Sequence, residues 1–148
     1  MPQIEIRALR PEDEPAWRRL WTGYLEFYET SVSDEVYAGS FARLLSEAAQ
    51  EFHGRIALVD GVPSGIVHYL FHRHMWKIEN ACYLQDLYVA AEARGTGLGR
   101  ALIERVYAEA DAAGAPAVWW LTQDFNHEAR RLYDRIGVKT PFIRYNRA

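Results

Sequence analysis

The pattern of hydrophobic and polar positions predicts a chain that alternates between strands and helices. Apolar and polar residues alternate over residues 4–9, which is typical of a half-buried strand. Residues 81–89 are instead almost continuously apolar, as expected of a central strand that is covered on both faces. From residue 98 apolar residues recur with helical spacing, and Gly114 marks the expected end of that helix. The strongest signal is therefore a buried strand that passes through a short turn into a helix.

The other predicted elements surround this unit. They are an aromatic helix after Pro11, a helix over residues 34–51 with Ser33 or Asp34 as its cap, strands over 55–60 and 64–72 joined by an Asp-Gly turn, a strand over 117–122, a helix over 126–136 and a strand over 142–145. Helices interspersed with strands in this order predict a mixed α/β fold with helices on both faces of one sheet. A length of 148 residues fits one domain, residues 1–148.

Charge and composition narrow the classes of partner. The net charge is −3 and the isoelectric point is near 5.9, which argues against nucleic acid or an anionic membrane as a partner. No apolar run approaches the roughly 18 residues of a membrane span. The single cysteine, Cys82, lies inside the apolar strand, so we expect a buried structural thiol and a reducing, cytoplasmic location.

Three histidines near the end of the predicted strand over 64–72 share one parity. His68, His72 and His74 could therefore point to one face. A zinc site is conceivable, but no fourth ligand stands at a recognisable spacing. We expect instead partly exposed histidines near the mouth of a substrate site.

Glycines at positions 95, 97 and 99 lie at the start of the helix that follows the buried strand. The first N–H groups of a helix have no intrahelical partner and attract anions, and glycines let a phosphate approach the backbone. No Lys-Ser or Lys-Thr pair follows Gly99, and Leu102 stands where a dinucleotide fingerprint needs glycine. The alternative is a glycine-rich helix start without a ligand, but the flanking Arg94 and Arg100 favour a pyrophosphate.

Two motifs, in this order and spacing, resemble a known family. Residues 94–99 (RGTGLG) have the form R/Q-x-x-G-x-G/A, and residues 126–137 are similar to N-x-x-A-x-x-L-Y-x-x-x-G. Both are features of the GNAT superfamily of acetyl-CoA-dependent N-acetyltransferases, and the resemblance covers the chain from Ile4 onward. The stretches YLQDLYV, VWWLTQDFN and TPFIRY look like the fungal histone, polyamine and D-amino-acid acetyltransferase group and its bacterial relatives. The resemblance implies a central mixed, mostly antiparallel sheet with splayed strands.

The resemblance also implies acetyl-CoA as co-substrate, with its pyrophosphate on the glycine loop and its pantetheine along the buried strand. The residues that it assigns to acetyl-CoA are Leu87, Tyr88, Val89, Arg94, Gly95, Thr96, Gly97, Leu98, Gly99, Arg100, Asn126 and Tyr133. A strand that parts from its neighbour has free backbone groups, which the pantetheine amides can pair with. Asn126 is equally suited to cap the helix that it precedes, and the two roles can coexist.

The same resemblance suggests the catalytic residues. Tyr133 matches the tyrosine that protonates the departing sulfur, although a tyrosine on an apolar helix stripe can also simply be core. Gln85 replaces the glutamate base that is usual in the related strand, and an amide cannot accept the proton. Asp86 is then the candidate base or ammonium anchor, with His72, His74, Glu79 or a water chain as alternatives. Strand alternation puts Gln85 and Asp86 on opposite faces unless a bulge intervenes.

The expected reaction is acetyl transfer to a primary amine by direct attack. Candidate substrate contacts are Tyr24, Tyr28, Tyr83 and Gln85. One alternative is a non-catalytic acyl-CoA-binding or sensing protein on the same scaffold. Another is an acyltransferase with a longer donor, but the bulk of Tyr83, Tyr88 and Trp119 favours acetyl. The amine, small or lysine-like, is not identified, and we expect a homodimer.

Overall fold

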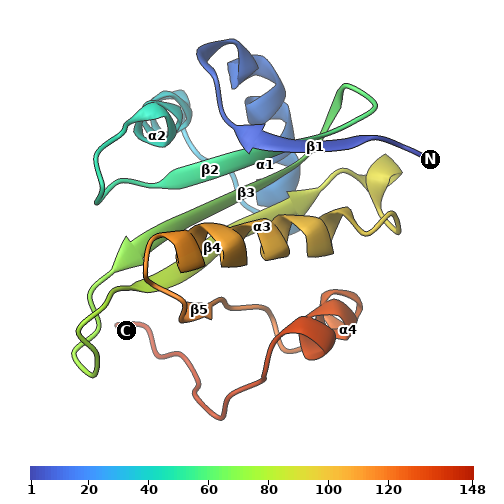
Figure 1. Ribbon diagram of the computed structural model, residues 1–148. Helices are drawn as coiled ribbons and strands as arrows, with labels where there is room; N and C mark the ends of the chain where they lie inside the picture. Colours follow the sequence, from blue (N-terminus) through green and yellow to red (C-terminus); the bar gives the residue numbers. More distant parts are fainter.

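A five-stranded sheet forms the centre of the computed structural model, which describes residues 1–148 (Figure 1). Its strands are β1 (Ile4–Ala8), β2 (His53–Val59), β3 (Val62–His72), β4 (Ala81–Val89) and β5 (Val118–Trp119), and they lie side by side in chain order. All neighbours are antiparallel except β4 and β5. A parallel pair needs a crossover, which the helix α3 (Leu98–Ala112) supplies. The mixed, mostly antiparallel sheet is thus confirmed.

Helices cover both faces of the sheet, as predicted. The helices α1 (Glu14–Phe27) and α2 (Asp34–Leu45) lie on one face, where Trp17 and Phe41 pack with Ile56 and Ile66 of the sheet. On the opposite face the buried side chains of α3 pack against a second core, and α4 (His127–Ile136) follows β5 (Figure 1). Two short 3-10 helices, η1 (Pro11–Asp13) and η2 (Ala91–Ala93), complete the elements. None of the helices combines the length and apolar character that a membrane span requires.

Three predicted elements differ clearly from the structure. Ser33 caps α2 as expected, but the helix ends at Leu45 instead of residue 51, because Ser46 is extended. The strand expected over 117–122 is reduced to Val118–Trp119. Residues 142–145 form no strand, and Phe142 is 79% exposed. The aromatic and β-branched residues of this tail have strand propensity, but no strand edge within the chain pairs with them.

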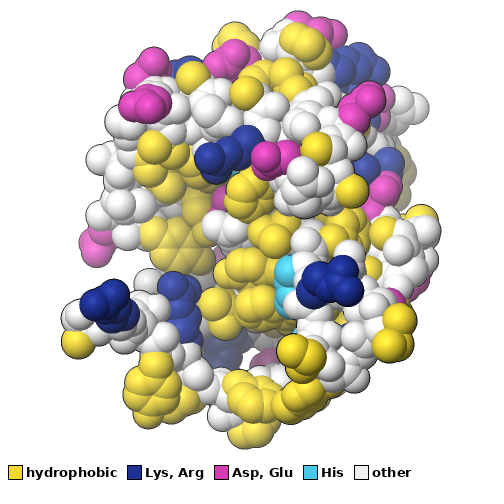
Figure 2. Space-filling model, turned by 90° about the vertical axis from the view of Figure 1, so that its left-hand side faces the viewer, with side chains coloured by type: hydrophobic (Ala, Val, Ile, Leu, Met, Phe, Trp, Pro, Cys, Tyr) yellow, Lys and Arg dark blue, Asp and Glu magenta, His cyan; other side chains and the backbone are white.

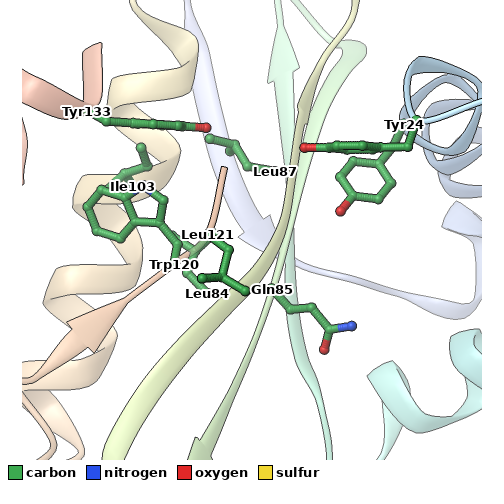
Figure 3. A pocket seen from close by; sticks show the side chains of 9 residues that line it. Tyr24, Leu84, Gln85, Leu87, Ile103, Trp120, Leu121 and Tyr133 are labelled. Atoms are coloured by element: carbon green, nitrogen blue, oxygen red, sulfur yellow. The ribbon is translucent and has the colours of Figure 1, made fainter. Parts of the chain in front are cut away.

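A β-bulge changes the direction of the side chains in the middle of β4. His68 of β3 stands opposite Asp86, and the next residue, Tyr69, stands opposite Leu84, so Gln85 is the extra residue. Leu84 and Leu87 therefore pack towards α3, while Asp86 meets β3 and α1 side chains on the other face. Figure 3 shows the Gln85 side chain on the same side of β4 as Tyr24 of α1. The expectation that Gln85 and Asp86 face opposite ways applied only without a bulge, and this bulge places both on the α1 side of β4.

The strands β4 and β5 part soon after they meet. They pair only at Cys82–Val118 and Tyr83–Trp119. The N–H of Ala90 donates to Ser64 on the β3 side, and N–H directions alternate along a strand, so the N–H groups of Val89 and Leu87 point to the open edge. The Val89 carbonyl on this strand accepts a hydrogen bond from Arg94 Nε at 3.1 Å. The sheet thus presents free backbone donors beside the start of α3.

Candidate active site

A pocket with an empty volume of about 310 Å³, part of it open to solvent, lies where β4 and β5 part. Residues of α1, β4, α3, α4 and the chain around β5 line it: Tyr24, Tyr28, Leu84, Gln85, Leu87, Ile103, Trp120, Leu121 and Tyr133. Figure 3 shows the hydroxyl groups of Tyr24 and Tyr133 pointing towards each other from opposite sides of the pocket, with Leu87 between them. Residues far apart in the sequence thus converge on the open edge of β4.

The side chain of Tyr133 reaches the pocket from α4. Its ring packs against Trp120, with centroids 5.5 Å apart and an interplanar angle of 68°. Burial raises the pKa of Tyr133 to about 12, and its hydroxyl projects into the pocket (Figure 3). Asn126 positions the helix, since its side-chain oxygen accepts a hydrogen bond from the N–H of Ala129 at 3.3 Å. The predicted cap is therefore confirmed, and the pocket receives a protonated phenol at neutral pH.

On the opposite side of the pocket, the carboxylate of Asp86 lies near Tyr24 and Tyr28. The rings of Tyr24 and Tyr28 lie 5.0 Å apart. Burial, and then the negative charge of Asp86, raise the pKa of both hydroxyls. Tyr83 does not line the pocket but stacks on Trp119 at 4.1 Å, and its pKa is also raised mainly by burial. This side of the pocket therefore suits a cationic or amine-bearing group.

Asp86 takes part in a buried chain of hydrogen bonds. His68 Nδ1 lies 2.8 Å from Asp86 Oδ2, and Trp17 Nε1 donates to His68 Nε2 at 2.9 Å. Trp17 was not identified as a site residue from the sequence, and His68 was expected only as a partly exposed histidine near the mouth of the site. The signal available was the indole N–H of a core tryptophan, which needs an acceptor when it is buried.

His68, His72 and His74, which share one parity along the chain, do not form a cluster. His68 is buried, which corrects the expectation of partial exposure, whereas His72 and His74 are half-buried. His72 Nε2 accepts from Trp119 Nε1 at 2.8 Å, and His74 Nδ1 accepts from the backbone N–H of Trp76 at 3.1 Å. Each histidine thus has its own partners.

The glycine loop has the backbone of an anion site. Gly95 and Gly97 adopt φ values of +78° and +84°, and an added Cβ at either would meet no atom within 4 Å. Gly97 is the N-cap of α3, and the first intrahelical bond joins Ala101 N–H to the Gly97 carbonyl. The N–H groups of the first helical residues, Leu98 to Arg100, therefore lack intrahelical partners. The space that side chains would fill is open in front of them.

The side chains around this loop hold its shape. Thr96 Oγ1 donates to the Ala93 carbonyl at 2.6 Å. The guanidinium of Arg94 lies 5.7 Å from the centre of the Tyr88 ring, and Arg100 forms an exposed ion pair with a glutamate one turn further along α3. The Tyr88 ring faces α1, since a Cβ at Gly23 would lie 2.5 Å from its hydroxyl. Only the backbone of Tyr88 is thus near the open edge.

Comparison with known proteins agrees with this geometry. Residues 10–138 match the acetyltransferase (GNAT) family. The chain is 40% identical over 147 residues to the D-amino-acid N-acetyltransferase HPA3 of Saccharomyces cerevisiae, covering 98% of this chain and 91% of that one. It is 28% identical to the aminoalkylphosphonate N-acetyltransferase of Salmonella typhimurium, covering 100% and 93%.

Solved structures show the same fold. Aminoglycoside N-acetyltransferase AAC(6')-Iy in complex with CoA has a TM-score of 0.84 at 18% identity, covering 100% of this chain and 96% of that one. The matched family spans most of the chain, from η1 to the residues after α4. The chain therefore belongs to the GNAT family of acetyltransferases and is an N-acetyltransferase.

Proposed function

We propose that this enzyme transfers the acetyl group of acetyl-CoA, by direct attack, to the primary amine of a small molecule that also carries an acidic group. The position of Tyr133 carries the proposal. Its hydroxyl projects into the pocket at Leu87, and Tyr24 faces it from the other side (Figure 3). A donor lying along the open edge of β4 and an amine entering beside Tyr24 would therefore meet at this hydroxyl.

Acetyl-CoA, when bound, supplies the thioester that is attacked. The free N–H groups at the start of α3 and the loop Arg94, Gly95, Thr96, Gly97, Leu98, Gly99 and Arg100 would hold its pyrophosphate. The open N–H groups of Leu87 and Val89, on either side of Tyr88, would pair with its pantetheine arm, near Asn126 and Tyr133. The similar fold of AAC(6')-Iy, described in complex with CoA, supports this assignment.

The residues of the pocket can serve both bond changes. The bound ammonium first gives one proton to water, which leaves a neutral amine. A bond then forms between the amine nitrogen and the acetyl carbon, the carbon–sulfur bond breaks, and one N–H proton ends on the sulfur. The N–H of Leu87 is placed to polarise the thioester carbonyl. With a pKa of about 12, Tyr133 stays protonated and donates to the sulfur as negative charge develops there. The proton released by the nitrogen then restores the phenol.

The class of amine follows from the pocket and the relatives together. Asp86 provides the negative charge that attracts an ammonium group, with Tyr24, Tyr28 and the exposed Gln85 as walls and Tyr83 beside them. A D-amino acid and an aminoalkylphosphonate, which give two relatives their names, both combine an amine with an acidic group. The guanidinium of Arg144 acts on Tyr83 and is a candidate partner for that acid.

Thiol release from acetyl-CoA tests the proposal. The panel holds D- and L-amino acids, aminoalkylphosphonates, polyamines, aminoglycosides and a lysine peptide, with propionyl- and hexanoyl-CoA as longer donors. We expect turnover with acetyl-CoA and the highest kcat/KM for amines with an acidic group. Binding of acetyl-CoA by calorimetry without thiol release from any amine would show a sensing protein instead.

We also propose that the enzyme is a homodimer of the cytoplasm. Large exposed hydrophobic residues gather at the β3–β4 hairpin and in the C-terminal tail, and Figure 2 shows hydrophobic side chains around a hollow on one face of the molecule. They include Met75, Trp76, Ile78, Phe142, Ile143 and Tyr145. A second copy would cover them. The buried thiol of Cys82, with a pKa raised to about 11, fits a reducing compartment. Light scattering of the wild type and of Phe142→Asp tests the assembly.

A further inference from the structure

The hydrogen-bond chain below the pocket fixes the protonation of one histidine. An indole nitrogen can only donate, so Trp17 Nε1, at 2.9 Å, makes His68 Nε2 an acceptor without a proton. The proton of the neutral imidazole is then on Nδ1, which donates to Asp86 Oδ2 at 2.8 Å. A second proton on Nε2 would set two donors against each other. His68 is therefore a neutral ring in a single tautomer.

The carboxylate that receives this bond lies between the core and the pocket. His68 donates to Oδ2, and the Tyr24 hydroxyl, which faces the pocket, lies close enough to the carboxylate for a hydrogen bond between them to help raise the pKa of Tyr24. The Asp86 side chain is 11% exposed. Its charge acts on Tyr24 and Tyr28, which line the pocket. One oxygen is thus held by the core, while the carboxylate reaches the pocket beside the hydroxyl of Tyr24.

The bulge in β4 makes this arrangement possible. Because Gln85 is the extra residue, Asp86 comes directly opposite His68 and shares its face of the sheet. Without the bulge, Asp86 would point towards α3, away from Trp17. The hydrogen bond from His68 also fixes the rotation of the Asp86 carboxylate. A fixed orientation matters for a group that must meet a substrate ammonium.

We propose that His68 is a positioning residue, which holds the Asp86 carboxylate turned so that, beside Tyr24, it binds the ammonium group of the amine substrate. Trp17 acts one step further back, since it selects the tautomer of His68 that can donate. This inference rests on the proposed function, because it concerns the amine side of the same pocket. The chemical group recognised is a primary ammonium, and His68 itself does not touch it.

Two substitutions separate positioning from packing. In His68→Asn the amide N–H₂ replaces Nδ1–H and keeps the donor to Asp86. In His68→Gln the amide lies nearer the position of Nε2, so the acceptor for Trp17 is kept and the donor to Asp86 is lost. The matched control is His53→Gln, since His53 is a half-buried histidine stacked on Tyr69, away from Asp86.

The assay measures the KM of the best amine and of acetyl-CoA for each variant by thiol release. For His68→Gln we expect the amine KM to rise roughly 10- to 100-fold, as for loss of a hydrogen bond to a charged group, with the acetyl-CoA KM unchanged. For His68→Asn and His53→Gln we expect the amine KM to stay within about threefold. An unchanged amine KM in His68→Gln, or equal damage in both His68 variants, would overturn the proposal.

A measurement without turnover keeps the test independent of activity. Nitrogen-15 NMR of the histidine side chains at pH 7, assigned with His68→Asn, should show a neutral His68 with its proton on Nδ1. A proton on Nε2, or an imidazolium, would overturn the inference even in an active enzyme. Failure of the proposed function is seen separately, as absence of thiol release by the wild type.

Discussion

Replacing Tyr133 by phenylalanine removes one oxygen atom from the pocket and little else. The ring keeps its packing against Trp120, and the hydroxyl projects into the pocket instead of bonding to the protein. Because no protein hydrogen bond is lost, the free energy of unfolding should change by less than about 1 kcal/mol. The melting temperature should then move by no more than a few degrees.

The effect on catalysis should be much larger. Loss of a positioned proton donor lowers kcat by roughly 10²- to 10⁴-fold, or about 3–5 kcal/mol of transition-state stabilisation. The acetyl-CoA KM should remain near that of the wild type. A donor acts while it is protonated, so its contribution is present below its pKa and is lost as pH rises through about 12. In the wild type, deprotonation of Tyr133 should therefore cause no fall in kcat between pH 6 and about 10.

The matched control is Tyr107→Phe. The Tyr107 hydroxyl donates to the Ile136 carbonyl at 2.8 Å, outside the pocket. Its loss should cost about 1 kcal/mol of stability and leave kcat intact. Thiol-release kinetics and thermal melts of both variants test this. If the reasoning holds, Tyr133→Phe loses kcat and keeps its melting temperature, whereas Tyr107→Phe keeps kcat and melts at a lower temperature. A Tyr133→Phe enzyme with kcat within about threefold of wild type would return this residue to a packing role.

Three further predictions concern the glycine loop before α3, the ion pair at η1 and the end of α4. Gly97→Val and Gly61→Val should each lose about 1–2 kcal/mol, because both glycines have φ near +80° with open space around them. Only Gly97→Val should weaken acetyl-CoA binding in calorimetry, and equal affinities would contradict the pyrophosphate assignment. Arg7 donates two hydrogen bonds to the Asp13 carboxylate, at 2.7 and 3.0 Å, and thereby lowers the pKa of that carboxyl. The stabilisation of the fold by this ion pair is therefore present above pH 4 and is lost as the pH falls below 4. Asp13→Asn should cost roughly 1–2 kcal/mol at neutral pH and clearly less in urea melts near pH 2, and a cost that does not shrink there would exclude the charge as its cause. A Cβ at Gly137 would lie 2.8 Å from a ring carbon of Trp120. Gly137→Ala should therefore cost about 1–3 kcal/mol of stability and lower kcat by displacing α4. A melting temperature equal to that of the wild type would show that the Trp120 ring moves freely.

Features set by local chemistry could be predicted from the sequence. The continuous apolar run gave the bounds of β4, residues 81–89, correctly. Ser33 and Asn126 cap their helices because a short polar side chain satisfies a free N–H wherever a helix begins. Tyr133 and Tyr24 reached one pocket because helix spacing and strand order together place them on facing elements.

Features that depend on a partner could not be predicted in this way. The bulge at Gln85 arises from the register of two strands, and neither strand alone shows it. The burial of His68 depends on Trp17, which lies 51 positions earlier in the chain. Residues 46–51 have good helix formers but do not continue α2, since packing of an apolar face supplies most helical stability.

The helix that carries Tyr133 buries none of its residues fully. Protein segments with few buried groups open most readily, at free energies well below that of global unfolding. A ligand that binds only the closed form lowers the open population by a factor of one plus its concentration over its Kd. Acetyl-CoA held between α4 and the open edge of β4 would therefore supply packing contacts that this part of the molecule lacks. Local order around the phenol would then depend on the concentration of acetyl-CoA.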